Sequence, residues 1–196
     1  MTVEVDGKPL PAPAGRRAWS LLAWLALHPG PQARGELAAR FWPDVLDTSA
    51  RASLRSAVRT LRRDLGEAGG AHVVATRDHV ELDGDVAVDA REFDALVAEG
   101  ELARAVELGD APLLAGFEDE WALRARDAHR DHLIDVLERL AEDAEPKAAL
   151  IYTRRQVALE PMGEEVHRRL MRRLAATGDR PAALAAYERL RERLRR

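Results

Sequence analysis

Residues 48–65 read TSARASLRSAVRTLRRDL, and this stretch decides the fold predicted for the N-terminal part of the chain. Its apolar residues recur every three or four positions, which is the spacing of one buried face of an α-helix. They are Leu54, Ala57, Val58, Leu61 and Leu65. Asp47 stands where a side chain can cap the first turn, and Gly66 stands where a helix commonly ends. We therefore predict an amphipathic helix from Thr48 to Leu65.

The side of this helix away from the apolar face carries arginines, and no acidic residue lies between Asp47 and Asp64. A solvated helix face ordinarily mixes both signs, because opposite charges three or four residues apart stabilise it and like charges repel. The phosphates of duplex DNA would relieve the repulsion, and arginine can also hold guanine in a bidentate way. The arginines are Arg51, Arg55, Arg59, Arg62 and Arg63, and all but Arg63 share one stripe. The short polar residues between them, which allow close approach to DNA, are Ser49, Ser53, Ser56 and Thr60.

Arginine content by itself says little about function, because the whole chain prefers arginine to lysine. Of its 30 basic residues only Lys8 and Lys147 are lysine. The formal net charge of -4 does not indicate a nucleic-acid partner either, and the whole acidic excess lies after Arg91. The alternative hypothesis for the stripe is a surface helix in an arginine-rich protein, so its place in the fold must decide.

Two shorter helices are predicted before the arginine-rich helix. Val3 and Val5 alternate with polar neighbours as in a short strand, and the prolines that follow break regular structure. Apolar residues at helical spacing predict a first helix that begins near Arg16 and a second helix from Ala33 to Phe41. Arg34, at the start of the second helix, is expected to join the DNA contacts.

A hairpin is predicted after the arginine-rich helix. The runs His72–Thr76 and His79–Leu82 have the composition of strands, and Arg77-Asp78 joins them. One strand, three helices and a hairpin form a winged-helix outline, in which the third helix enters the major groove and the hairpin touches the DNA backbone. Arg77 and His79 are the candidate backbone contacts, although either residue could equally face water.

The rest of the chain is predicted to be all helix. Ala148-Ala149-Leu150 recurs 34 residues later as Ala182-Ala183-Leu184, which is the period of a two-helix tetratricopeptide unit, and each copy follows a turn. The expected fold class is therefore mainly α, with an N-terminal winged helix-turn-helix over residues 1–86 and an all-α tetratricopeptide-like domain over residues 87–196. The helical pattern still runs at Arg196, as it would in a fragment of a longer regulator.

Several functional classes are not expected. The absence of cysteine excludes disulfides, a thiol nucleophile and thiolate metal sites, and no glycine-rich phosphate loop or nucleophile elbow is present, so we expect no enzyme and no cofactor. His129 and His132 have a spacing that could hold a metal, but a solvated helix face is the favoured interpretation and no metal is expected. No apolar run is long enough to span a bilayer and no leader precedes the first helix, so we expect a cytoplasmic protein without membrane contact.

A stacked helical repeat leaves a concave groove in which a peptide or a small effector could bind. The residues that we expect to line such a groove are His167, Arg168, Arg172 and Tyr187.

The order of these motifs resembles the Streptomyces antibiotic regulatory protein type of transcriptional activator. The segments that look like its winged-helix domain are Arg17–Leu27, Arg34–Asp44 and Leu54–Leu65. The segments that look like its bacterial transcriptional activation domain are Val88–Phe93, Pro112–Phe117, Glu120-Trp121, Glu164–His167 and Gly178–Arg189. The likeness covers nearly the whole chain.

This resemblance implies an activator that binds direct repeats of double-stranded DNA near a promoter, as tandem protomers or a homodimer, and that contacts RNA polymerase. It implies that Arg51, Arg55, Arg59 and Arg62 read the groove, and that Trp42, Asp44 and Asp47 belong to the polymerase-contacting loop. The alternative hypothesis is a helical-repeat module for protein interaction or small-ligand sensing, whose winged helix does not bind DNA.

Overall fold

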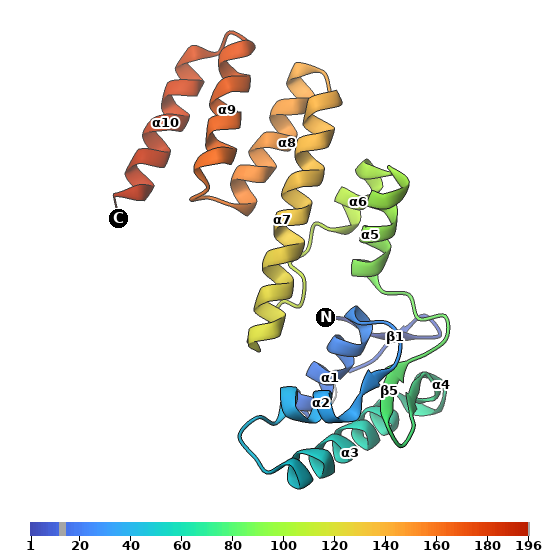
Figure 1. The fold of residues 1–196 in the computed structure, drawn as a ribbon. Helices are drawn as coiled ribbons and strands as arrows, with labels where there is room; N and C mark the ends of the chain where they lie inside the picture. The colour runs from blue at the N-terminus through green and yellow to red at the C-terminus, as the bar shows by residue number, and fades with distance from the viewer. Residues whose placement is uncertain (12–14, 196) are drawn as a thin grey trace. The chain divides into compact units, whose positions relative to one another are not determined.

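A computed structural model of the chain describes residues 1–11 and 15–195 (Figure 1). The chain divides into two compact units. The first comprises Met1–Arg91 together with Leu114–Ala122, and the second comprises Glu92–Leu113 together with Leu123–Arg196. The predicted fold class, a mainly α protein with a winged helix followed by tetratricopeptide-like helices, is confirmed.

The first unit is built around three helices and a small sheet. Its elements are β1 (Glu4–Val5), β2 (Lys8–Pro9), α1 (Arg16–Leu27), β3 (Gln32–Ala33), α2 (Arg34–Phe41), α3 (Asp47–Asp64), α4 (Gly66–Ala71), β4 (Val73–Ala75) and β5 (His79–Leu82). Leu21, Leu37, Leu54 and Leu61 join α1, α2 and α3 in one core, and each is at most 2% exposed. Burial of these side chains fixes which face of α3 points outward.

The wing is a three-stranded antiparallel sheet in the order β3-β5-β4. The two predicted hairpin strands are present as β4 and β5. The sequence did not predict β3, in which Ala33 pairs with His79 instead of starting the second helix. Helix α2 therefore begins one residue later, at Arg34.

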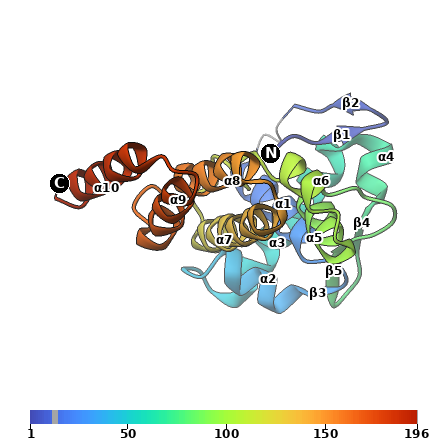
Figure 2. The same cartoon turned by 90° about the horizontal axis from the view of Figure 1, so that it is seen from above.

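The N-terminal strand proves to be a hairpin. Asp6 and Gly7 have φ values of 52° and 71°, and two left-handed residues in succession make the tight turn that joins β1 to β2. Figure 2 shows this hairpin beside α4. A Cβ at Gly69 of α4 would lie only 2.8 Å from Cγ2 of Val5, so glycine is needed for this close approach.

The ends of α3 differ in part from the prediction. The residue before the helix is Leu46, and Asp47 is the first helical residue rather than the cap. The Asp47 carboxylate accepts a hydrogen bond from Arg51 Nε at 2.8 Å, so it does not cap the first turn. At the other end Gly66 has a φ of 71°, as expected of a glycine that ends a helix.

Residues 114–122 pack on the first unit although they lie far from it in sequence. The ring of Trp121 meets that of Trp24 edge to face, with 5.2 Å between the ring centroids. Ser20 Oγ donates a hydrogen bond to Asp119 Oδ2 at 2.9 Å, and Arg17 lies 3.6 Å from the same carboxylate. The winged-helix core thus includes a segment from the activation half of the chain.

The second unit contains six helices in its described part, and Figure 1 shows the last four side by side in sequence order. They are α5 (Asp89–Glu99), α6 (Leu102–Leu108), α7 (Glu120–Asp143), α8 (Pro146–Leu159), α9 (Glu164–Ala176) and α10 (Arg180–Leu194); the first residues of α5 and α7 fall in the first unit. Helices α8 and α10 each carry a proline in the first turn. Within residues 1–11 and 15–195, no helix combines the length and the apolar content needed to cross a bilayer.

A polar cluster that sequence reasoning missed links α7, α8 and α9. Arg173 donates to both carboxylate oxygens of Glu138 at 2.8 Å and to Thr153 Oγ1 at 2.7 Å. Gln156 Nε2 donates to Glu138 Oε2 at 3.1 Å. Burial acts to raise the pKa of Glu138, but hydrogen bonds from Arg173 and Gln156 and the charges of Arg173 and Arg169 outweigh it and hold that pKa below its usual value.

Candidate nucleic-acid interface

Helix α3 presents its arginine stripe to solvent. Leu54 and Leu61 have no exposed surface, so the opposite face of the helix must point outward. Arg51, Arg55, Arg59 and Arg62 are all exposed, as the stripe predicted. Of the short residues between them, Ser49 and Ser56 are exposed, whereas Ser53 and Thr60 are half-buried.

Three arginines from two helices gather at one place on this face. Arg34, the first residue of α2, is half-buried. The pKa of Arg34 is lowered from its usual value, first by burial and then by the positive charges of Arg55 and Arg62. Like charges held this close destabilise the free protein, and an anion bound between them would remove that cost.

Two stripe arginines already have partners in the free protein. Arg51 forms the 2.8 Å ion pair with Asp47, and both of these side chains are more than half exposed. A Cβ added at Gly35 would lie 3.6 Å from Arg51 Nη2, so this guanidinium reaches the start of α2. Arg62 Nε donates to the carbonyl oxygen of Val73 in β4 at 2.9 Å, which holds its side chain toward the wing.

The wing lies next to the start of α2. The backbone N–H of Arg34 donates to Asp78 O at 2.9 Å, and Arg34 Nη1 donates to Thr76 O at 3.2 Å. Thr76 Oγ1 shapes the wing turn by accepting from the backbone N–H groups of Asp78 at 3.3 Å and His79 at 3.1 Å. Exposed Arg77 and His79 flank Asp78, so the structure places both predicted wing residues beside Arg34.

Arg63 lies apart from the stripe. Its guanidinium pairs with Asp64, with 2.8 Å between Arg63 Nη2 and Asp64 Oδ1. It is exposed, but its charge is partly neutralised by this neighbour. Among the arginines of α3, Arg63 is therefore the least favoured candidate for DNA contact.

The loop between α2 and α3 exposes apolar side chains that the sequence did not single out. Trp42 is half-buried and packs at the edge of the core, with its ring centroid 6.1 Å from that of Phe41. Asp44 is exposed, whereas Asp47 is engaged with Arg51. Val45 is 48% exposed and Leu46 is 79% exposed. Of this loop, Asp44, Val45 and Leu46 are the residues best placed to meet another protein.

The four residues predicted to line a groove in the second unit do not converge on one site. His167 is 3% exposed and lines a pocket of about 240 Å³, whereas Arg168 and Tyr187 line a second pocket of about 370 Å³. Arg172 lines neither of these two pockets and donates to Glu165 Oε1 at 3.0 Å.

The histidines weighed as metal ligands pack against an aromatic ring. The rings of His129 and His132 lie 4.6 Å and 5.2 Å from the ring of Phe93, both in edge-to-face geometry. His132 Nδ1 also lies 3.3 Å from Asp94 Oδ1. In the described part of the chain, no group of three or more metal-ligating side chains comes together.

A winged helix with an exposed arginine-rich third helix, joined to a stack of helices, is the architecture expected of a winged-helix transcription regulator. Residues 80–196 match the family described as the bacterial transcriptional activator domain, and the chain belongs to this family. This match confirms the predicted resemblance to the Streptomyces antibiotic regulatory protein type of activator, and it covers the part of the chain in which the activation domain was expected.

Among solved structures, the chain is similar to EmbR of Mycobacterium tuberculosis, which was determined in complex with a low affinity phosphopeptide. The TM-score is 0.72 at 22% sequence identity, and the match covers 98% of this chain and 57% of that chain. At this identity the likeness establishes the fold, and the chain spans little more than half the length of that protein. A search of curated proteins gives no match.

Proposed function

We propose that the protein is a sequence-specific DNA-binding transcriptional activator, with residues 1–86 as the DNA-binding domain and residues 87–196 as the activation domain. The observation that carries the proposal is the cluster of Arg34, Arg55 and Arg62, in which burial and then the positive charges of Arg55 and Arg62 lower the pKa of Arg34. Phosphates are the ligands that relieve such repulsion most directly. The chromosomal DNA that such a regulator binds would place the protein in the cytoplasm.

In the proposed complex α3 lies in the major groove. Arg55 and Arg59, near the middle of the exposed stripe, are the candidates for reading base edges. Arg34, Arg62 and Arg77 would bind backbone phosphates, because the wing and the start of α2 flank α3. Arg51, Ser49, Ser56 and His79 complete the proposed surface. Direct repeats bound by tandem protomers, which the family resemblance implies, would repeat this interface along one face of the duplex.

We further propose that the loop between α2 and α3 contacts RNA polymerase. Support comes from the exposure of Val45 and Leu46 next to the acidic Asp44, since apolar side chains rimmed by charge mark protein-binding surfaces. Trp42 would hold this loop against the core by packing on it, and it would not contact the polymerase itself.

The dependence of DNA affinity on salt tests the proposal. If four or five phosphates are bound, the logarithm of the association constant should fall linearly with the logarithm of salt concentration, with a slope of about -4. The alternative, a helical-repeat module whose winged helix docks on protein, predicts no measurable duplex binding at low salt. The proposal would be contradicted by a lack of duplex binding at low salt, or by binding whose salt slope is near zero.

A further inference from the structure

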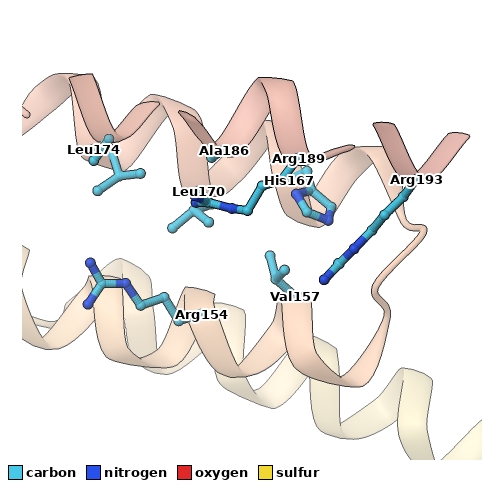
Figure 3. Close-up of a pocket in the computed structure, with 9 residues that line it drawn as sticks. Arg154, Val157, His167, Leu170, Leu174, Ala186, Arg189 and Arg193 are labelled. Atoms are coloured by element: carbon cyan, nitrogen blue, oxygen red, sulfur yellow. The ribbon is translucent and has the colours of Figure 1, made fainter. Parts of the chain in front are cut away.

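The pocket that His167 lines lies among α8, α9 and α10 and combines an apolar floor with a cationic rim (Figure 3). Leu170, Leu174 and Val157 supply apolar surface, and Leu170 and Leu174 are buried. Arginines from two helices complete the lining: Arg154 from α8, and Arg189 and Arg193 from α10. Its volume of about 240 Å³ lies just below the range of ordinary small-molecule sites.

One polar atom in this lining is buried without a partner. His167 Nε2 lies 3.1 Å from the carbonyl oxygen of Pro161, and a carbonyl can only accept, so Nε2 carries the proton. Nδ1 is then an acceptor, and among the described residues it has no hydrogen-bond partner. A buried acceptor left unsatisfied is costly, which makes Nδ1 a position that a ligand donor would fill.

The arginines around the pocket are available to an anion. Arg193 Nη1 donates to the same Pro161 oxygen at 3.2 Å, which holds this guanidinium beside His167. Arg154 and Arg189 are exposed, and no acidic side chain in the described part of the chain pairs with either of them. The arginines of α9 differ from these two, because Arg168, Arg169 and Arg172 all pair with glutamates.

We propose that this pocket binds a small organic anion that has an apolar body, a carboxylate or phosphate group, and a hydroxyl or N–H donor. Figure 3 shows Arg193 at the His167 end of the pocket and the guanidinium group of Arg154 at the opposite end. The anionic group would therefore lie on Arg154 and Arg189, the apolar body on Leu170 and Leu174, and the donor on His167 Nδ1, where Arg193 adds further positive charge. One water could satisfy Nδ1, but it would neither fill the volume nor neutralise three guanidinium groups. The proposal rests on the second unit alone and does not depend on DNA binding.

Such a ligand would join three helices of the activation half. It would contact α8 through Arg154, α9 through His167 and α10 through Arg189 and Arg193. Binding to the folded state alone raises the unfolding temperature, and the size of the rise follows the ratio of ligand concentration to Kd.

The test uses the full chain and three probes: 4-hydroxyphenyl phosphate, phenyl phosphate and inorganic phosphate. We expect 4-hydroxyphenyl phosphate to bind with a Kd of about 1 mM or tighter by calorimetry and to raise the unfolding temperature. Phenyl phosphate should bind more weakly because it lacks the donor for Nδ1. Inorganic phosphate should bind most weakly because it also lacks the apolar body.

The double variant Arg154→Gln, Arg189→Gln changes only exposed side chains and should weaken 4-hydroxyphenyl phosphate at least about tenfold. The matched control Arg104→Gln, Arg139→Gln removes the same charge from exposed positions on α6 and α7 and should leave the Kd unchanged. The proposal is overturned if none of the three probes binds at about 10 mM, which is ten times the expected upper limit of the Kd. It is equally overturned if the two double variants lose affinity to the same extent, which would mean non-specific attraction of anions.

Discussion

Replacing Arg55 by alanine is expected to affect the free protein and its DNA complex in opposite directions. Arg55 is exposed, and its charge helps to lower the pKa of Arg34. Removing it relieves that repulsion, and alanine is at least as good a helix former as arginine. The free energy of unfolding of Arg55→Ala should therefore be unchanged or higher by a few tenths of a kcal/mol, at about the size of one like-charge pair on a helix.

The complex should lose one charge contact. If Arg55 binds one phosphate, the salt slope becomes shallower by about 0.9, which corresponds to about fivefold weaker binding at 0.15 M salt and about fifteenfold at 0.05 M. If Arg55 instead holds a guanine edge, the loss is about 1–3 kcal/mol on the preferred sequence and smaller on an unrelated duplex.

Urea unfolding of the free protein measures the first effect, and fluorescence anisotropy of a labelled duplex over a series of salt concentrations measures the second. Arg139→Ala on α7 is the matched control, because it removes an exposed arginine from outside the proposed surface. An Arg55→Ala protein with native affinity at every salt concentration would refute the role assigned to the cluster. So would a loss of more than about 1 kcal/mol of stability, since Arg55 would then be a structural residue.

Three further outcomes are expected. Arg173→Met should lower the free energy of unfolding by about 3 kcal/mol, because the mostly buried Glu138 carboxylate loses both hydrogen bonds from Arg173 and, among the described residues, keeps only Gln156 and the more distant Arg169. Arg168→Met, which breaks a pair with the exposed Glu165, should cost at most about 1 kcal/mol in the same urea titration. The folded-state pKa of Glu138 lies below its unfolded value, so its contribution to stability is present above the unfolded pKa and is lost as pH falls through the folded pKa. In Glu138→Gln, the free energy of unfolding should therefore fall less steeply as the pH is lowered. Leu46→Asn should reduce promoter-dependent transcription in vitro while leaving DNA affinity within about twofold, since Leu46 is 79% exposed, lies outside the arginine stripe and is replaced without a change of charge. A parallel loss of DNA affinity would contradict the loop's assignment to the polymerase.

The sequence predicted best those elements whose pattern is local. The apolar spacing of α3 is complete within its own 18 residues, and the same residues determine which face holds the arginines. The 34-residue recurrence of Ala-Ala-Leu likewise marks the starts of α8 and α10, since Pro146 and Arg180 begin the two helices. Such signals need no partner from elsewhere in the chain.

Features that depend on distant partners escaped prediction. Strand β3 is two residues long, and only its pairing with β5, more than 40 residues later, makes Gln32 and Ala33 extended. The packing of Trp121 on Trp24 and the bonds from Arg173 to Glu138 are likewise set by the tertiary fold. No periodicity in one segment carries information about such contacts.

The candidate sites show the same difference between local patterns, which the sequence predicts, and contacts between distant residues, which it does not. Residue type and spacing placed Arg51, Arg55, Arg59 and Arg62 on one exposed face, but the joining of Arg34 to Arg55 and Arg62 depends on how α2 meets α3. In the second unit, helical spacing could not separate His167 from Tyr187, which line different pockets. Which side of each helix is buried and which is exposed decides which residues line the same pocket.

Selection of bound duplexes from a random DNA pool tests the central claim most directly, because it requires no assumption about the target. We expect the native protein to enrich one motif arranged as direct repeats. The variant with both Arg55→Ala and Arg59→Ala should enrich no motif, although its urea midpoint of unfolding should equal that of the native protein. A native protein that enriches no sequence, or a double variant that is folded and enriches the same motif, would contradict the assignment of α3 as the helix that reads DNA.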